Sequence, residues 1–173
     1  GVRSLYTNSI GVNNVANGFE SLYSNTTGNY NVALGSGALY SNTNGVHNTA
    51  IGMNANVSTG GLGNATTIGA YAFATTSNSL ILGGILGVNG SPYNTNVGIG
   101  TTAPLDRLHV VGNIRMADGN QAIGKVLTSD ANGTASWQTP ASTSSYWSRS
   151  SGGQLYPTTI TDNIGIGTAT PLE

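Results

Sequence analysis

The sequence GFESLYSNTTGNYNVAL (residues 18–34) is followed directly by GSGALYSNTNGVHNTAI (residues 35–51), and the two stretches are copies of one seventeen-residue pattern. The leading glycine of the pattern recurs at a constant spacing, at Gly1, Gly18, Gly35, Gly52 and Gly69. An asparagine stands four positions before three of these glycines, at Asn14, Asn31 and Asn48. A fixed period of this kind is typical of stacked repeat architectures.

The composition of each copy favours a β-coil over a pair of helices. Glycine occurs twice in most copies, and each glycine would weaken a helix by roughly 1 kcal/mol relative to alanine. Val32 and Leu34 alternate with Ala33, as expected for a strand in which successive side chains point to opposite faces. The Asn- and Gly-rich segments between these runs suit turns. Each copy therefore predicts one coil of a β-solenoid, with coils stacked about 4.8 Å apart.

The apolar residues of the coils divide into two predicted rows. We expect the β-branched and leucine side chains of the alternating runs to fill the narrow interior, at Val32, Leu34, Ile51 and Ile68. A second row then faces outward, made of Leu5, Tyr6, Leu22, Tyr23, Leu39 and Tyr40. Because a monomer would leave this row in water, the pattern indicates burial between chains. We expect three chains, although the period does not itself fix that number.

Residues 31–35 and 48–52, with the Ala-Leu-Tyr-Ser-Asn run of residues 38–42 between them, resemble the head repeats of YadA-like trimeric adhesins. They are closer still to related repeats of phage tail fibres. The resemblance covers roughly residues 1–83 and implies a trimeric left-handed β-roll. The repeat is longer here than in the adhesin heads, which implies that the extra residues bulge as loops.

A second duplication follows the repeats. Residues 96–105 (NVGIGTTAPL) reappear as residues 163–172 (NIGIGTATPL). They resemble the modules in shafts of tail fibres, which implies intertwined β-hairpin shaft modules. Asn132-Gly133, flanked by alternating residues, predicts a hairpin turn. The expected fold is therefore all-β, with a β-roll at residues 1–83, a shaft module with a hairpin at 84–138, and a linker and the start of a second shaft module at 139–173.

The composition restricts the classes of partner. Only 6% of the residues are charged, against about 25% in ordinary soluble domains, and the net charge is −1. This charge gives no field to attract nucleic acid or an anionic membrane surface. The longest apolar run is interrupted by glycines and falls short of the ~20 residues of a membrane span. We therefore expect neither nucleic-acid binding nor membrane insertion.

The chemical motifs have structural explanations. Residues 98–103 match the loose dinucleotide-binding pattern, but Pro104 and the recurrence of the motif at Gly165 favour a turn. The ionisable side chains gather between positions 106 and 118, at Asp106, Arg107, His109, Arg115 and Asp118. No metal-ligand or paired-carboxylate spacing is found among them, so ion pairs between subunits are favoured over a catalytic patch. Asp130 lacks the further ligands of a calcium loop. We expect no catalytic residue, metal or cofactor.

The repeats also offer places for a receptor. The tyrosine row suits either an interchain seam or the stacking of sugars, and the turn segments give candidate receptor-facing positions at Asn25, Asn29, Asn42 and Asn44. The predicted function is a structural segment of a phage or phage-like tail fibre, a homotrimer on the virion that projects a tip toward a cell-surface glycan or protein. The alternative is a bacterial surface adhesin head that binds host or matrix ligands. A polysaccharide-degrading solenoid enzyme is disfavoured by the scarcity of acidic residues.

Overall fold

A computed structural model describes residues 1–58, 60–140, 147–149 and 155–157. The described residues form strands and turns without a helix. The strands are β1 (Val15–Asn17), β2 (Val32–Leu34), β3 (Thr49–Ile51), β4 (Asn56–Val57), β5 (Ala65–Ile68), β6 (Phe73–Ala74), β7 (Ser79–Leu82), β8 (Val97–Ile99), β9 (Leu108–Val110), β10 (Val126–Ser129), β11 (Ala135–Gln138), β12 (Trp147–Arg149) and β13 (Leu155–Pro157). The all-β prediction is confirmed for this part of the chain.

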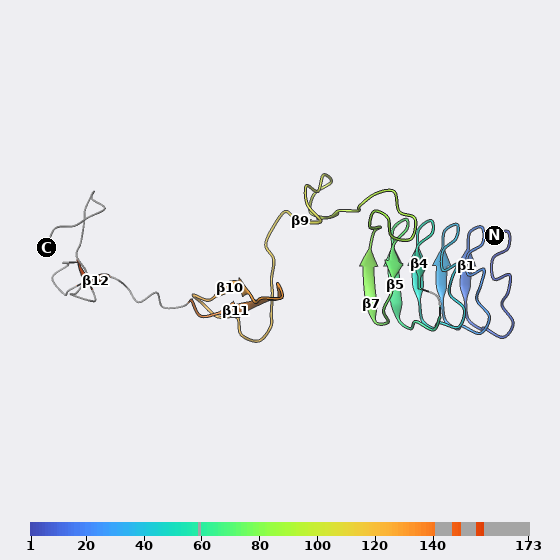
Figure 1. The fold of residues 1–173 in the computed structure, drawn as a ribbon, viewed down its shortest axis with the longest axis horizontal. Coiled ribbons are helices and arrows are strands. Elements are labelled where there is room, and N and C mark those ends of the chain that lie inside the picture. Colours follow the sequence, from blue (N-terminus) through green and yellow to red (C-terminus); the bar gives the residue numbers. More distant parts are fainter. Residues whose placement is uncertain (59, 141–146, 150–154, 158–173) are drawn as a thin grey trace. The chain divides into compact units, whose positions relative to one another are not determined.

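The repeats stack as a β-solenoid of about four turns. Its main sheet is parallel, in the order β1-β2-β3-β5-β7, and the strands lie side by side in Figure 1. Val15 pairs with Val32, which pairs with Thr49, so each step along the sheet equals one seventeen-residue repeat. The last step is shorter, because Ser79 of β7 pairs with Ala65 of β5. A second, two-stranded parallel sheet joins β4 to β6 on another side of the coils.

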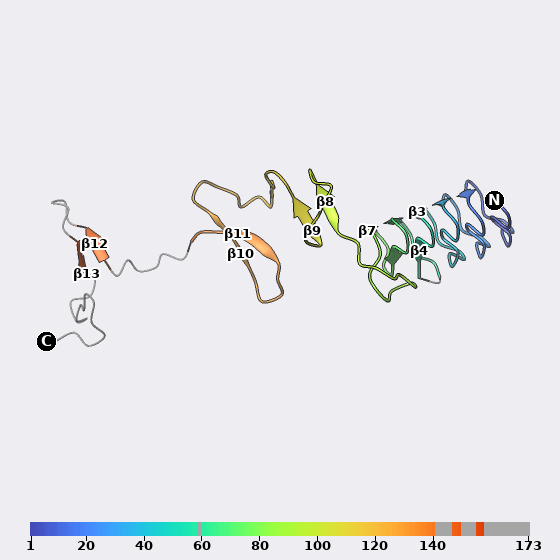
Figure 2. The ribbon, with the colours of Figure 1, turned by 90° about the horizontal axis from the view of Figure 1, so that it is seen from above.

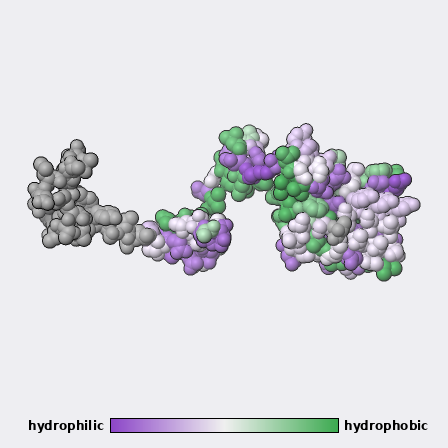
Figure 3. All heavy atoms as spheres, in the orientation of Figure 1, coloured by the Kyte–Doolittle hydropathy of each residue, from purple (hydrophilic) through white to green (hydrophobic). Residues whose placement is uncertain are grey.

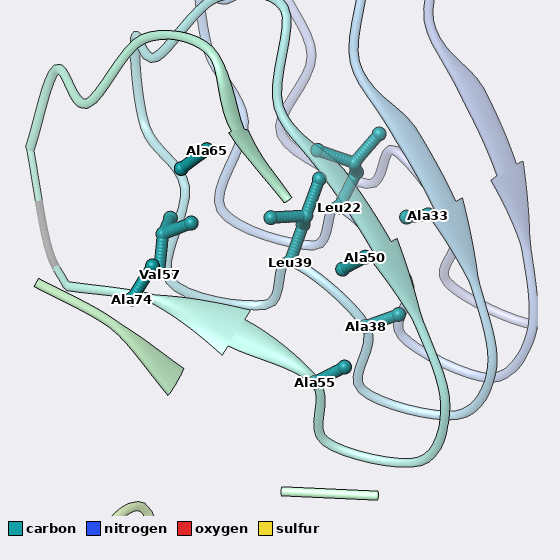
Figure 4. Close-up of a cluster of buried hydrophobic side chains, with 9 residues drawn as sticks. All are labelled: Leu22, Ala33, Ala38, Leu39, Ala50, Ala55, Val57, Ala65 and Ala74. Atoms are coloured by element: carbon teal, nitrogen blue, oxygen red, sulfur yellow. The ribbon is translucent and has the colours of Figure 1, made fainter. Parts of the chain in front are cut away.

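The interior of the solenoid corrects the predicted division of apolar residues. Ala33 and Ala50, at the centres of β2 and β3, are fully buried, together with Leu22 and Leu39 from the turns. Figure 4 shows these side chains in one cluster. The prediction that Leu22 and Leu39 face outward was therefore wrong. The prediction that the larger residues of the strands fill the interior was also wrong, because Leu34, Ile51 and Ile68 are exposed and Val32 is only half-buried.

The physical reason lies in the backbone of the turns. Leu5, Leu22 and Leu39 all have a left-handed backbone, with φ of 52°, 51° and 51°. The alternation of strands does not hold through such a residue, so the alternating pattern could not predict the direction of these side chains. The left-handed backbone at each of these leucines costs roughly 1–2 kcal/mol of folding free energy. In return the leucine enters the core and its N–H bonds to the next coil, as from Leu22 N to Ala38 O at 2.9 Å.

Two ladders of buried asparagines run along the stack. In one, Asn25 Nδ2 donates to Asn8 Oδ1 (2.8 Å) and Asn42 Nδ2 donates to Asn25 Oδ1 (3.0 Å). In the other, the N–H of Asn31 donates to Asn14 Oδ1 and the N–H of Asn48 donates to Asn31 Oδ1, both at 2.9 Å. Buried amides need such partners, and a seventeen-residue repeat supplies one from each neighbouring coil. The ladders fix the register between coils.

The chain divides into two compact units, Gly1–Asn113 and Ile114–Glu173. The sequence placed boundaries after residues 83 and 138 instead, and these stay predictions. Residues 84–95 contact the solenoid, since Asn89 Nδ2 donates to Asn54 O at 2.6 Å. Further along this unit, β8 and β9 form a parallel pair.

The second unit contains the predicted hairpin, in which β10 and β11 pair antiparallel (Figure 2). Its turn is closed by the Asp130 carboxylate, which accepts the N–H groups of Asn132 (2.9 Å) and Thr134 (2.8 Å). Trp137 Nε1 donates to Met116 O at 2.9 Å. A second antiparallel pair joins β12 to β13. The repeated motif at residues 163–172 lies outside the described residues.

Candidate functional site

The outer face of the main sheet presents a regular row of apolar side chains on the described coils. Because β2, β3, β5 and β7 are in register, Leu34, Ile51, Ile68 and Leu82 form one row across four strands. Their exposed fractions are 37%, 40%, 40% and 45%. We call this row the outer apolar row.

A second outward row runs beside it, two residues earlier in each strand. It consists of Val15, Val32, Thr49, Thr66 and Leu80. Neither outward row contains an ionisable side chain. Covering the face would therefore remove apolar area from water without the cost of burying a charge. Figure 3 shows apolar surface gathered at the β7 end of the solenoid, with paler surface over the N-terminal coils.

The predicted tyrosine ladder is present in the structure. The rings of Tyr6 and Tyr23 stack with centroids 5.3 Å apart, and those of Tyr23 and Tyr40 at 5.0 Å. His47 stacks on Tyr30 in the same way, at 5.2 Å. Since Tyr23 has a ring on both of its faces, a sugar could not stack on it. The ladder therefore presents ring edges along its length.

The four predicted receptor-facing asparagines divide into two pairs. Asn25 and Asn42 are fully buried in an asparagine ladder, so the prediction that they face a receptor was wrong. Their side chains turn inward because each also donates to a glycine carbonyl of its own turn, as from Asn25 Nδ2 to Gly28 O at 3.1 Å. Asn44 is exposed and Asn29 is half-buried. Asn29 Oδ1 accepts the N–H of Val12 at 2.7 Å, so Asn44 is the one of the four that is exposed on a turn.

The ionisable residues between positions 106 and 118 do not pair with one another in the described part of the chain. Arg107 Nη1 instead donates to Thr95 O at 3.1 Å, and His109 Nδ1 accepts the N–H of Leu105 at 3.2 Å. The one ion pair among the described residues is Arg3–Glu20, at 3.1 Å between neighbouring coils. The interpretation of the 106–118 group as ion pairs between subunits stays a prediction.

The remaining motifs have local structural roles. Residues 98–103 begin within β8 and are not followed by a helix, so the helix N-terminus that would hold a pyrophosphate is not formed there. A hydrogen bond from the N–H of Asn120 lowers the pKa of the Asp118 carboxyl. No cluster of three or more His, Cys, Asp or Glu side chains suited to a metal occurs among the residues that the structure describes.

Comparison of the chain with family models, with curated proteins and with solved structures finds no match. Within the described ranges, no helix has the length and hydropathy needed to cross a bilayer. The functional assignment therefore rests on the residues of the chain and their arrangement.

Proposed function

We propose that this chain is a non-enzymatic segment of a trimeric fibre, from a phage or phage-like tail fibre that projects a host-binding tip. The observation that carries the proposal is the outer apolar row, because the solenoid has already filled its interior with Leu22, Leu39 and the strand alanines. The row runs across coils rather than along one strand. A partner chain with the same repeat therefore meets like side chains at every step.

The assignment to the tail-fibre class rests on the resemblance of the repeats and of the duplicated motif at residues 96–105. In this proposal the coils are the left-handed β-roll of that class, and residues after the solenoid form intertwined shaft modules. The parallel β8–β9 pair and the β10–β11 hairpin are the parts of those modules that the chain builds by itself.

The alternative is the head of a bacterial surface adhesin. The feature that favours it is the tyrosine ladder, whose exposed ring edges lie along the coils with Tyr6 at 65% exposure. Such edges suit contacts with a glycan or protein receptor. Binding to host-cell or matrix components without any effect on phage adsorption would support this alternative over the fibre.

The oligomeric part of the proposal is tested by light scattering on the 17.5 kDa chain. A trimer gives about three times that mass, and Ile51→Glu should dissociate it because three carboxylates would be buried together. Asn44→Glu, an equal change at an exposed turn, should leave the mass unchanged. A monomeric mass for the unsubstituted protein would refute the trimer.

A further inference from the structure

The chain contains four Asn-Gly pairs, and this dipeptide is prone to spontaneous deamidation. In the reaction the backbone nitrogen of the glycine attacks Cγ of the asparagine, and glycine leaves room for the attack because it lacks a Cβ. The asparagine side chain must turn toward that nitrogen, and the nitrogen must lose its proton to hydroxide. The pairs are Asn17-Gly18, Asn44-Gly45, Asn89-Gly90 and Asn132-Gly133.

Two of the pairs are held by hydrogen bonds within the unit that contains the solenoid. Asn17 is the last residue of β1, and its carbonyl accepts the N–H of Gly35 at 2.8 Å, so the backbone can turn there only if the main sheet opens. The side chain of Asn89 is fixed directly, because Nδ2 donates to Asn54 O at 2.6 Å. We expect both pairs to react slowly in the folded chain.

The pair at position 44 is protected on its glycine side. Asn44 is exposed, but Gly45 is buried. The Gly45 carbonyl accepts Asn31 Nδ2 at 2.8 Å, and an added Cβ on Gly45 would meet Asn42 Oδ1. We therefore expect the Gly45 nitrogen to react only when this turn leaves the asparagine ladders.

The pair in the β10–β11 turn is the most accessible of the four. Asn132 and Gly133 are both exposed, whereas each of the other pairs includes a buried or half-buried residue. The Gly133 N–H donates to Asp130 O at 3.1 Å, and this bond must break before the nitrogen can lose its proton. Every residue of β10 is exposed, and a two-stranded hairpin is only marginally stable in water, so this opening costs little.

We propose that Asn132 is a site of spontaneous covalent modification, reached through local opening of the hairpin. The Gly133 nitrogen gives its proton to hydroxide and bonds to Asn132 Cγ, while the Cγ–Nδ2 bond breaks and ammonia leaves with a proton from water. Water then adds to the resulting succinimide and opens it on either side. Cleavage of the new N–Cγ bond gives aspartate, and cleavage of the original peptide bond gives isoaspartate.

The two products differ in their effect on the hairpin. Aspartate leaves the main chain unchanged, whereas isoaspartate carries it through Cβ and Cγ and so lengthens the turn by a carbon atom. The hydrogen bonds that close the turn, from Asp130 N to Thr134 O (2.9 Å) and from Thr134 N to Asp130 Oδ1 (2.8 Å), then lose their alignment. Isoaspartate therefore weakens the strand pairing that begins at Ser129 and Ala135.

The test incubates the whole chain in mildly alkaline buffer, folded and in denaturant, and follows each Asn-Gly pair in peptic peptides by mass spectrometry. In denaturant the four pairs should react within about threefold of one another, because each is then the same dipeptide in an unfolded chain. In the folded chain Asn132 should react at least about tenfold faster than Asn17, Asn44 and Asn89. Any other pair that reacts as fast as Asn132 in the folded chain would overturn the proposal.

A disulfide across the hairpin tests the opening step. Ser129 and Ala135 are directly paired, and the chain has no cysteine, so Ser129→Cys with Ala135→Cys gives one cross-link that can be formed or reduced. The oxidised form should deamidate at Asn132 at least about fivefold more slowly than the reduced form of the same variant. Equal rates in the two forms would overturn the proposed route through opening.

The products are compared by amide hydrogen exchange in β10 and β11. The purified isoaspartate form should exchange faster than the original protein. Asn132→Asp, which makes the aspartate product without lengthening the main chain, should exchange as slowly as the original. The reaction concerns the hairpin alone, so its outcome is independent of the outer apolar row.

Discussion

Replacement of Gly35 by alanine is expected to destabilise the solenoid through two separable effects. The backbone of Gly35 has φ of 133°, a region that residues with a side chain avoid. A Cβ at this position would also stand 2.6 Å from the carbonyl oxygen of Gly52 in the next coil. The strained backbone costs roughly 1–3 kcal/mol. Forcing the coils apart costs about 1–3 kcal/mol more, by analogy with overpacked cores.

Two further glycines separate these effects. Gly60 has φ of 109° but no atom within 4 Å of an added Cβ, so Gly60→Ala should show only the backbone cost. Gly28 lacks a positive φ, but its Cβ would meet Asn25 Oδ1 and Gly45 O, so Gly28→Ala should show only the contact cost. Gly35→Ala should therefore lose about as much stability as the other two variants together, roughly 2–6 kcal/mol.

The measurement is the free energy of unfolding, from denaturant titrations followed by circular dichroism at one protein concentration for all variants. The reasoning fails if Gly35→Ala loses no more stability than Gly60→Ala. In that case the close approach of successive glycines would not limit the spacing of the coils.

Three other substitutions test the described interactions. Asn31→Leu should cost roughly 1–3 kcal/mol of stability in the same titrations, because it leaves the N–H of Asn48 buried without a partner and leaves Gly45 O with only the 3.4 Å bond from Asn42 Nδ2. Asn44→Leu at an exposed turn should cost little. Trp137→Phe should lower the stability of the hairpin by about 1 kcal/mol, because the hydrogen bond from Trp137 Nε1 to Met116 O is lost. Amide hydrogen exchange in β10 and β11 should then become faster, and unchanged exchange rates would contradict this prediction. The pKa of Asp118 is lowered in the folded chain, so the stability that its carboxylate contributes is present above the ordinary carboxyl pKa and is lost as the pH falls through the lowered pKa. The NMR chemical shift of the Asn120 amide should follow this titration, because that amide donates to the Asp118 carboxylate. The same amide shift should not titrate in Asp118→Asn.

The regular part of the fold could be predicted from the sequence because identical residues recur at a constant spacing. The parallel register of Val15, Val32 and Thr49 follows directly from that spacing. The hairpin around Asn132-Gly133 was likewise predictable, since a turn pair with alternating flanks is a local signal.

The division between inside and outside could not be predicted in the same way. Alternation in a strand specifies two faces but not which face is buried, and the size of Leu34 and Ile51 favoured the wrong choice. The coil is narrow, so alanine fits inside at positions 33 and 50 while space remains for the leucines of the turns. Those leucines enter through a left-handed backbone that their sequence does not indicate.

The asparagines show the same limitation. Polar residues in a turn suggest exposure, yet Asn25 and Asn42 are buried because each finds a partner in the adjacent coil. The signal that could have revealed them was their recurrence at the repeat spacing. Asn44, which lacks an asparagine at the equivalent position in the preceding copy, is exposed.

The burial of the outer face between chains is tested most directly by distances between spin labels. The chain has no cysteine, so Thr49→Cys places a single nitroxide label on that face without changing the outer apolar row. In a trimer formed through this face, pulsed electron paramagnetic resonance should detect three coupled spins for the label at position 49. The distances between these labels on different chains should be shorter than the distances between labels placed at Asn44→Cys. Absence of coupling between labels at position 49, or shorter distances at position 44, would contradict the proposed interface.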